Sequence, residues 1–140
     1  MQKRNPAILR LLVSISYCCI IISGMHVGGP WIAYLLITLF TSVFYPLPFI
    51  YALLGIGGLV LYLIQPYRKL GGMYVQRIIG LAAMYVSLIL FFTEEGGAYN
   101  DSTFREAVPL ITLALFVLLS VWQIVLFISD WQKQQKLEQK

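Results

Sequence analysis

The fold is decided by residues Trp31–Ile64, which read WIAYLLITLFTSVFYPLPFIYALLGIGGLVLYLI and contain no Asp, Glu, Lys or Arg. As a single α-helix this stretch would measure roughly 51 Å, whereas the hydrocarbon core of a bilayer is about 30 Å thick. Pro46 and Pro48 remove two backbone donors and restrict the residues before them, so a helix break is expected there. The two halves, Trp31–Tyr45 and Pro48–Ile64, would measure about 22 and 26 Å, and each is slightly short for a full crossing.

The rest of the chain is similarly apolar. Its 140 residues are 59% hydrophobic and only 11% charged, with a mean hydropathy of +0.79, whereas soluble domains average about 25% charged residues. No charged residue occurs from Leu11 to Tyr67. Such a composition cannot form a water-soluble surface, which excludes soluble enzymes, nucleic-acid-binding proteins and disordered chains. We therefore predict an all-α, multi-pass transmembrane helical bundle that forms one integral-membrane domain over residues 1–140.

Three further apolar segments predict helices before and after this stretch. We expect Ala7–Met25 to be a retained signal-anchor helix, because Arg10 interrupts the apolar region that a cleavable signal peptide needs and no small-x-small site follows. Met73–Phe92 follows a basic loop, and Ala107–Ile128 is the most uniformly apolar segment. Residues 129–140 are expected to extend the last helix at the membrane surface.

The charged residues divide into three basic segments and one acidic loop. The basic segments are the N-terminal region, the loop near Arg68 and the C-terminal region, and the acidic loop is residues 93–106. Because cytoplasmic segments retain Lys and Arg, we place both termini in the cytoplasm of a bacterial-type membrane and the acidic loop outside. The predicted topology anchors are Lys3, Arg4, Arg10, Arg68, Lys69 and Arg77. Arg10 and Arg77 lie just inside their helices and are expected to reach toward the lipid headgroups.

The orientation indicated by the basic segments and the length of Trp31–Ile64 predict different numbers of crossings. Basic segments on one side require an odd number of crossings between the first turn and Arg68, whereas Trp31–Ile64 resembles two helices. In the first solution there are four crossings, and one of the two halves separated at Pro46 and Pro48 is a short re-entrant or interfacial helix shielded by the other helices. In the second there are five crossings with the N-terminus outside, which interfacial aromatic residues at the ends of both halves favour. These aromatic residues are Trp31, Tyr45, Tyr51 and Tyr62. We prefer four crossings, because Lys and Arg near helix ends set orientation.

No residue pattern indicates catalysis, a cofactor or a metal ion. The single histidine, His26, cannot complete a zinc site or a bis-histidine haem site. Cys18 and Cys19 are adjacent and lack the Cys-x-x-Cys spacing of thiol oxidoreductases. No ionisable residue is expected at mid-membrane depth, where proton relays and ion-coupling sites need one. We therefore expect no catalytic, cofactor-binding or metal-binding residues.

Small residues in two segments are spaced for close helix packing. Gly80, Ala83 and Ser87 lie on one face of the helix predicted from Met73, and Gly55 and Gly58 lie in the second half of the uncharged stretch. Small side chains allow helix backbones to approach closely within a membrane. The sequence leaves open whether this face meets the same chain, another copy or a different protein.

Three functional hypotheses remain. The first is a non-catalytic accessory, assembly or interaction subunit of a larger membrane complex, in which the small-residue face docks and the acidic loop or C-terminal region contacts partners. The alternative is a small homo-oligomeric channel or facilitator with a pore formed by the short helices around Pro46 and Pro48. The third is a membrane enzyme that acts on a lipid or quinone, for which His26 and the acidic loop would have to supply the chemistry. The expected partners are the lipid bilayer and other membrane proteins or copies of this chain, without nucleic acid.

Cysteine labelling distinguishes the two topologies. In a variant without Cys18 and Cys19, Gln2→Cys should be protected from an impermeant thiol reagent in intact cells, and Ala98→Cys should react. The reason is that the four-crossing topology places residue 2 inside and residue 98 outside. External labelling at both positions would contradict it and favour five crossings.

Overall fold

The computed structural model describes residues 6–23, 28–42, 45–64, 70–93 and 104–138. This part of the chain is mostly helical. Its elements are α1 (Pro6–Cys18), β1 (Ile21–Ser23), β2 (Gly28–Pro30), α2 (Trp31–Thr41), α3 (Pro46–Leu63), α4 (Leu70–Thr93) and α6 (Ala107–Glu138). Three of these helices are long and apolar enough to cross a membrane, through Pro46–Leu63, Tyr74–Thr93 and Ala107–Lys133. The expectations of a mostly helical chain with apolar helices long enough to cross a membrane, and of a helical extension after residue 128, are confirmed, whereas the β1–β2 pair was not expected.

The first helix is shorter than expected. Instead of continuing to Met25, α1 ends at Cys18, and Ile21–Ser23 pairs antiparallel with Gly28–Pro30. Ile20, Ile21 and Ile22 are β-branched and favour extended backbone. The backbone N–H of Ile21 donates to Thr112 Oγ1 of α6 at 3.0 Å, and that of Trp31 donates to the Ile20 carbonyl at 2.7 Å. These bonds satisfy backbone groups of the extended segment without a helix.

The break at the proline pair begins earlier in the chain than expected. α2 ends at Thr41 rather than Tyr45, and α3 begins at Pro46. Tyr45 is the N-cap with extended backbone, and both prolines lie in the first turn of α3. A proline costs no hydrogen bond there, since the first amide groups of a helix have no intrahelical acceptor. Pro46 and Pro48 therefore mark the start of α3 as well as the break between α2 and α3.

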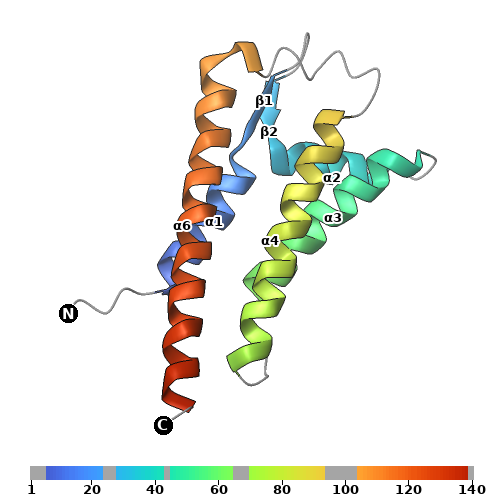
Figure 1. Cartoon of the computed structure of the whole chain (residues 1–140). Coiled ribbons are helices and arrows are strands. Elements are labelled where there is room, and N and C mark those ends of the chain that lie inside the picture. The colour runs from blue at the N-terminus through green and yellow to red at the C-terminus, as the bar shows by residue number, and fades with distance from the viewer. Residues whose placement is uncertain (1–5, 24–27, 43–44, 65–69, 94–103, 139–140) are drawn as a thin grey trace.

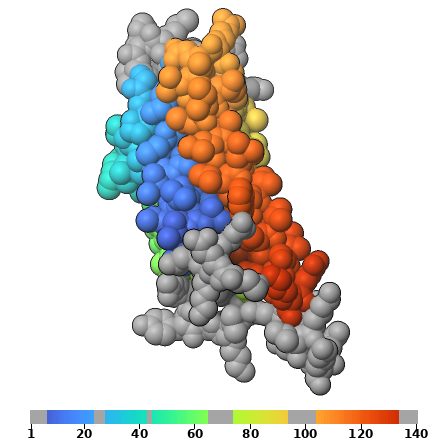
Figure 2. All heavy atoms as spheres, turned by 90° about the vertical axis from the view of Figure 1, so that its left-hand side faces the viewer, coloured from blue at the N-terminus to red at the C-terminus, as the bar shows by residue number. Residues whose placement is uncertain are grey.

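The helices form two closely associated groups (Figure 1). α1 lies along α6, and the two also run side by side in Figure 2. α3 packs along α4, while α2 lies against α3 and runs across the long axis of the molecule. The backbones of α4 and α6, by contrast, come close at few points, and these two helices meet mainly through side chains such as Tyr85 with Ser120 and Tyr74 with Phe127. The short hairpin β1–β2 joins the first group to α2.

The small residues bring the backbones of α3 and α4 into contact. A Cβ atom built on Gly58 would lie 2.7 Å from the Gly80 carbonyl oxygen, and one built on Gly80 would lie 2.8 Å from the Gly58 carbonyl oxygen. Ala83 Cβ would be 2.9 Å from the atom built on Gly58. This part of the small-residue face therefore meets the same chain, which answers the question that the sequence left open.

Substituting either glycine should destabilise the chain itself. Gly58→Ala or Gly80→Ala should lower the free energy of unfolding by about 1–3 kcal/mol, because the added methyl group forces two backbones apart. Thermal unfolding in mild detergent measures this. Gly57→Ala is the matched control, since nothing lies within 4 Å of a Cβ built there, and alanine is the better helix former. Equal stability of Gly58→Ala and Gly57→Ala would contradict the contact.

Candidate functional site

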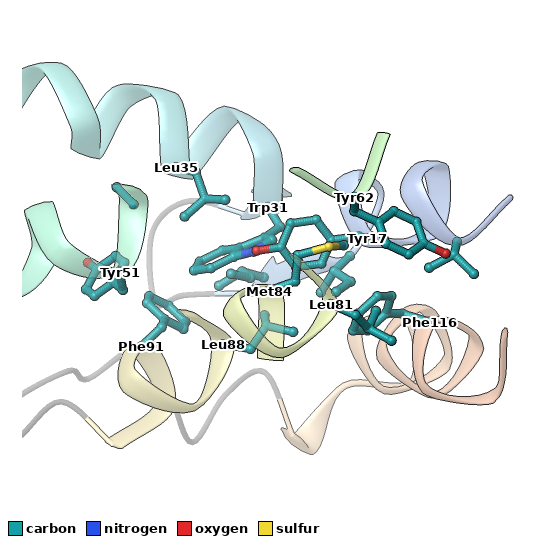
Figure 3. Close-up of a cluster of buried hydrophobic side chains, with 14 residues drawn as sticks. Tyr17, Trp31, Leu35, Tyr51, Tyr62, Leu81, Met84, Leu88, Phe91 and Phe116 are labelled. Carbon is teal, nitrogen blue, oxygen red and sulfur yellow. The ribbon is translucent and has the colours of Figure 1, made fainter. Parts of the chain in front are cut away.

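Aromatic side chains from several helices form a cluster in the interior (Figure 3). Trp31 lies at its centre, with ring centroids 4.9 Å from Phe91 and 6.4 Å from Tyr51. Tyr17 of α1 extends the cluster to Phe116 of α6, at 5.3 Å. Trp31, Tyr17 and Phe116 are each 0% exposed. The cluster thus joins both helix groups through their side chains.

Three of the four aromatic residues expected at the membrane interface belong to the interior. Trp31 and Tyr62 are 0% exposed and Tyr51 is 1% exposed, whereas Tyr45 is exposed. The first three fill space between helices, so packing against protein accounts for their positions. Their depth in a membrane, and with it the argument for five crossings, stays a prediction.

Several polar groups form hydrogen bonds between helices. Ser87 Oγ donates to the Tyr51 carbonyl oxygen at 2.6 Å, and the hydroxyls of Tyr34 and Tyr51 lie 3.1 Å apart. The Tyr17 hydroxyl points toward the Trp31 indole nitrogen in Figure 3, yet neither atom has a partner in hydrogen-bond geometry. A Cβ atom on Gly55 would lie 2.8 Å from the Tyr17 hydroxyl oxygen and 2.7 Å from Ser87 Oγ. Gly55 therefore makes room for these polar side chains.

A second polar group occupies the lower half of the interior. The Tyr62 hydroxyl of α3 donates to Gln123 Oε1 of α6, and the Tyr85 hydroxyl of α4 pairs with Ser120 of α6. Both bonds join α6 to the α3–α4 pair. Gln123 is the only amide side chain within Ala107–Ile128, and it is 1% exposed. An isolated amide in such an apolar segment could have predicted from the sequence that this position is buried.

Two arginines border this lower group. Arg77 is only 7% exposed, and its guanidinium carbon lies 5.7 Å from the centre of the Phe127 ring. The Nε atom of Arg77 and the Nη1 atom of Arg10 are buried and lack hydrogen-bond partners. On the exposed surface of α6, Lys133 and Asp130 form an ion pair, with 3.9 Å between Nζ and Oδ1. Arg77 thus points into the protein, whereas the sequence led us to expect it to reach the headgroups.

An apolar groove separates the lower halves of α4 and α6. Its volume is about 320 Å³. We call it the α4–α6 groove. Its lining includes Ile78, Leu81 and Ala82 from α4 and Ile124, Phe127 and Ile128 from α6. Phe127 therefore contacts Arg77 on one side and the groove on the other.

The remaining predicted site residues fall into two sets. Gly55, Gly58, Gly80, Ala83 and Ser87 are brought together between α3 and α4, while Pro46 and Pro48 open α3. Lys3, Arg4, Arg68, Lys69, His26 and most of the acidic loop lie outside the described residues. The residues that the structure describes contain no group of three or more His, Cys, Asp or Glu side chains placed to hold a metal. Cys18 and Cys19 are free thiols.

Comparisons with protein-family models, with curated proteins and with solved structures find no match to this chain.

The bond between Tyr62 and Gln123 should contribute measurably to stability. In a double-mutant cycle of Tyr62→Phe and Gln123→Leu, we expect a coupling of about 1 kcal/mol, the magnitude of interhelical hydrogen bonds in membranes. Each single variant should be destabilised, because it leaves a buried polar group unpaired. Unfolding in detergent measures the four proteins, with the exposed Tyr45→Phe as control. Additive effects would contradict the bond.

Proposed function

We propose that the chain crosses a membrane four times, through α1, α3, α4 and α6, with α2 as a short helix at one end. We further propose that it is a non-catalytic accessory, assembly or interaction subunit of a larger membrane complex. α6 supplies the surface that meets the partner.

The arrangement of helix ends supports four crossings. α1 and α4 begin, and α3 and α6 end, toward the lower end of Figure 1, whereas the hairpin and the start of α6 lie at the upper end. α2 spans Trp31–Thr41, about 16 Å, which is too short to cross a hydrocarbon core of about 30 Å. α1, at about 20 Å, is also too short by itself, so we propose that the extended residues of β1 complete its crossing. Such backbone is tolerated at membrane depth where it is buried in protein.

The outward face of α6 carries the proposed interaction role. Large side chains at alternating spacings of three and four residues are each at least half exposed there. They are Val108, Ile111, Leu115, Leu118, Trp122 and Val125. This spacing is that of helices that interlock along a seam. Within a membrane, such a seam is stabilised by the close packing of matching surfaces rather than by removal from water.

The contact between glycines of α3 and α4 also favours α6 as the surface that meets a partner. The small-residue face was the first candidate for docking a partner, but Gly58 and Gly80 contact each other between α3 and α4. A partner would therefore meet a surface with large side chains. α6 provides the longest such surface, since Ala107–Lys133 is an apolar span of 27 residues.

Affinity purification tests this role. A C-terminally tagged chain, produced at its native level and extracted in mild detergent, should co-purify with a fixed set of other membrane proteins in stoichiometric amounts, identified by mass spectrometry. Ile111→Ala combined with Leu118→Ala should reduce their recovery on the order of tenfold, the factor that corresponds to a packing loss of about 1.4 kcal/mol.

Leu110→Ala combined with Val121→Ala removes exposed side chains from a neighbouring face of α6 and should leave recovery unchanged. Purification of the chain alone as a discrete homo-oligomer would contradict the subunit role and favour the channel or facilitator. Solute flux through liposomes would then be the measurement to make.

A further inference from the structure

Arg10 of α1 and Arg77 of α4 are positively charged residues whose guanidinium groups each have a buried nitrogen without a hydrogen-bond partner. Arg10 lies one turn after the start of α1, and Arg77 lies three residues after Tyr74, where the apolar span of α4 begins. Both contribute to the electrostatic environment of the Tyr62 hydroxyl, and Arg10 also contributes to that of Arg77. We call these two residues the arginine pair.

The described part of the protein does not neutralise the arginine pair. The buried Nε of Arg77 and Nη1 of Arg10 have no hydrogen-bond acceptor. The nearby Gln123 Oε1 already accepts the Tyr62 hydroxyl. Asp130, the acidic residue of the described ion pair, is bound to Lys133 at the surface. Two like charges that are partly removed from water are costly unless an anion joins them.

Phosphate is the anion whose shape and depth fit. A guanidinium group offers a planar set of donors that pairs with two phosphate oxygens at once. Arg10 lies about one turn after the start of α1, and Arg77 lies about one turn after the start of the apolar span of α4, so a lipid phosphate that enters from the headgroup region is the anion nearest in depth. Aromatic residues also border the lower groove on both helices, with Tyr74 on α4 and Trp131 on α6, as is typical of the membrane interface.

The α4–α6 groove adds an apolar site beside the arginine pair. Its volume of about 320 Å³ falls at the lower end of the range of about 300–1,000 Å³ that is usual for small-molecule pockets. Phe127 borders the groove and contacts the Arg77 guanidinium. We propose that the arginine pair binds the phosphate of an anionic phospholipid, with one acyl chain lying in the α4–α6 groove.

Such a lipid would hold the two helix groups together. α1 and α6 belong to one group, whereas α3 and α4 belong to the other, and the backbones of α4 and α6 come close at few points. The phosphate connects α1 with α4, and the acyl chain fills the space between α4 and α6. This site does not depend on the proposed role of the outward face of α6.

Thermal unfolding with defined lipids tests the site. In detergent, phosphatidylglycerol should raise the Tm of the wild-type chain on the order of 5 °C, as a ligand specific for the folded state does. Phosphatidylcholine with the same acyl chains should have no comparable effect. Glycerol phosphate and inorganic phosphate distinguish a lipid from a free anion. If either anion alone raises the Tm as much as phosphatidylglycerol, the acyl-chain part of the proposal is overturned.

Arginine variants separate binding from structure. Arg10→Gln combined with Arg77→Gln should abolish the response to phosphatidylglycerol, while the Tm without lipid stays the same or rises because two buried charges are removed. Arg105→Gln, at an exposed arginine near the opposite end, should respond as the wild type does. An equal response in the double variant would overturn the proposal.

A groove variant tests the site with both arginines intact. Ala82→Phe should fill the α4–α6 groove and decrease the fraction of chains that retain a phospholipid in native mass spectrometry about tenfold. Val86→Phe, on the same helix but outside the groove lining, is the control. Unchanged retention in Ala82→Phe would overturn the acyl-chain assignment. If the arginine variants instead lost a co-purifying protein and kept the lipid, the lipid assignment would be wrong and an acidic partner residue would be favoured.

Discussion

The direct backbone contact between α3 and α4 at Gly58 and Gly80 determines the rest of the interior. Because neither residue has a side chain, each carbonyl oxygen lies where a Cβ atom of the other helix would otherwise stand. This close approach fixes the register of the two helices, so that Ser87 Oγ can donate a hydrogen bond to the Tyr51 carbonyl oxygen farther along the same interface. The polar bond therefore depends on the glycine contact, since a wider separation of the helices would leave a buried hydroxyl and a buried carbonyl unpaired.

The second constraint is that backbone polar groups at membrane depth need partners within the protein. The extended segment after α1 meets it in part through Thr112, which accepts from the Ile21 amide and thereby ties the hairpin to α6. The hairpin then delivers Trp31 to the centre of the molecule, where it meets Phe91 of α4. One local interruption of a helix thus brings an aromatic residue between the two helix groups, which straight helices of similar composition would not do.

The absence of charged residues and the positions of the prolines predicted where membrane helices occur and where they are interrupted. They did not predict which faces of these helices are buried. The long uncharged stretch predicted membrane helices, and Pro46 predicted the separation of α2 from α3. In a bilayer both the inward and the outward faces of a helix are apolar, so hydrophobic periodicity does not distinguish them. Tyr51 and Tyr62 therefore resembled interfacial residues although they are buried. The early end of α1 depends on the β-branched Ile20, Ile21 and Ile22 and on Thr112, far away in the sequence, and a local pattern can reveal only the first of these.

The burial of Arg77 follows from the same geometry. Four residues after Arg77, Leu81 faces both the interior and the groove, while Gly80 is held against α3. The contact at Gly80 fixes the rotation of α4, and that rotation directs position 77 toward Tyr62 and Phe127, on the side of α4 that faces other helices. A positive charge is therefore buried because the glycine contact places it there. In the proposed site, the phosphate of an anionic lipid compensates this charge from the headgroup region.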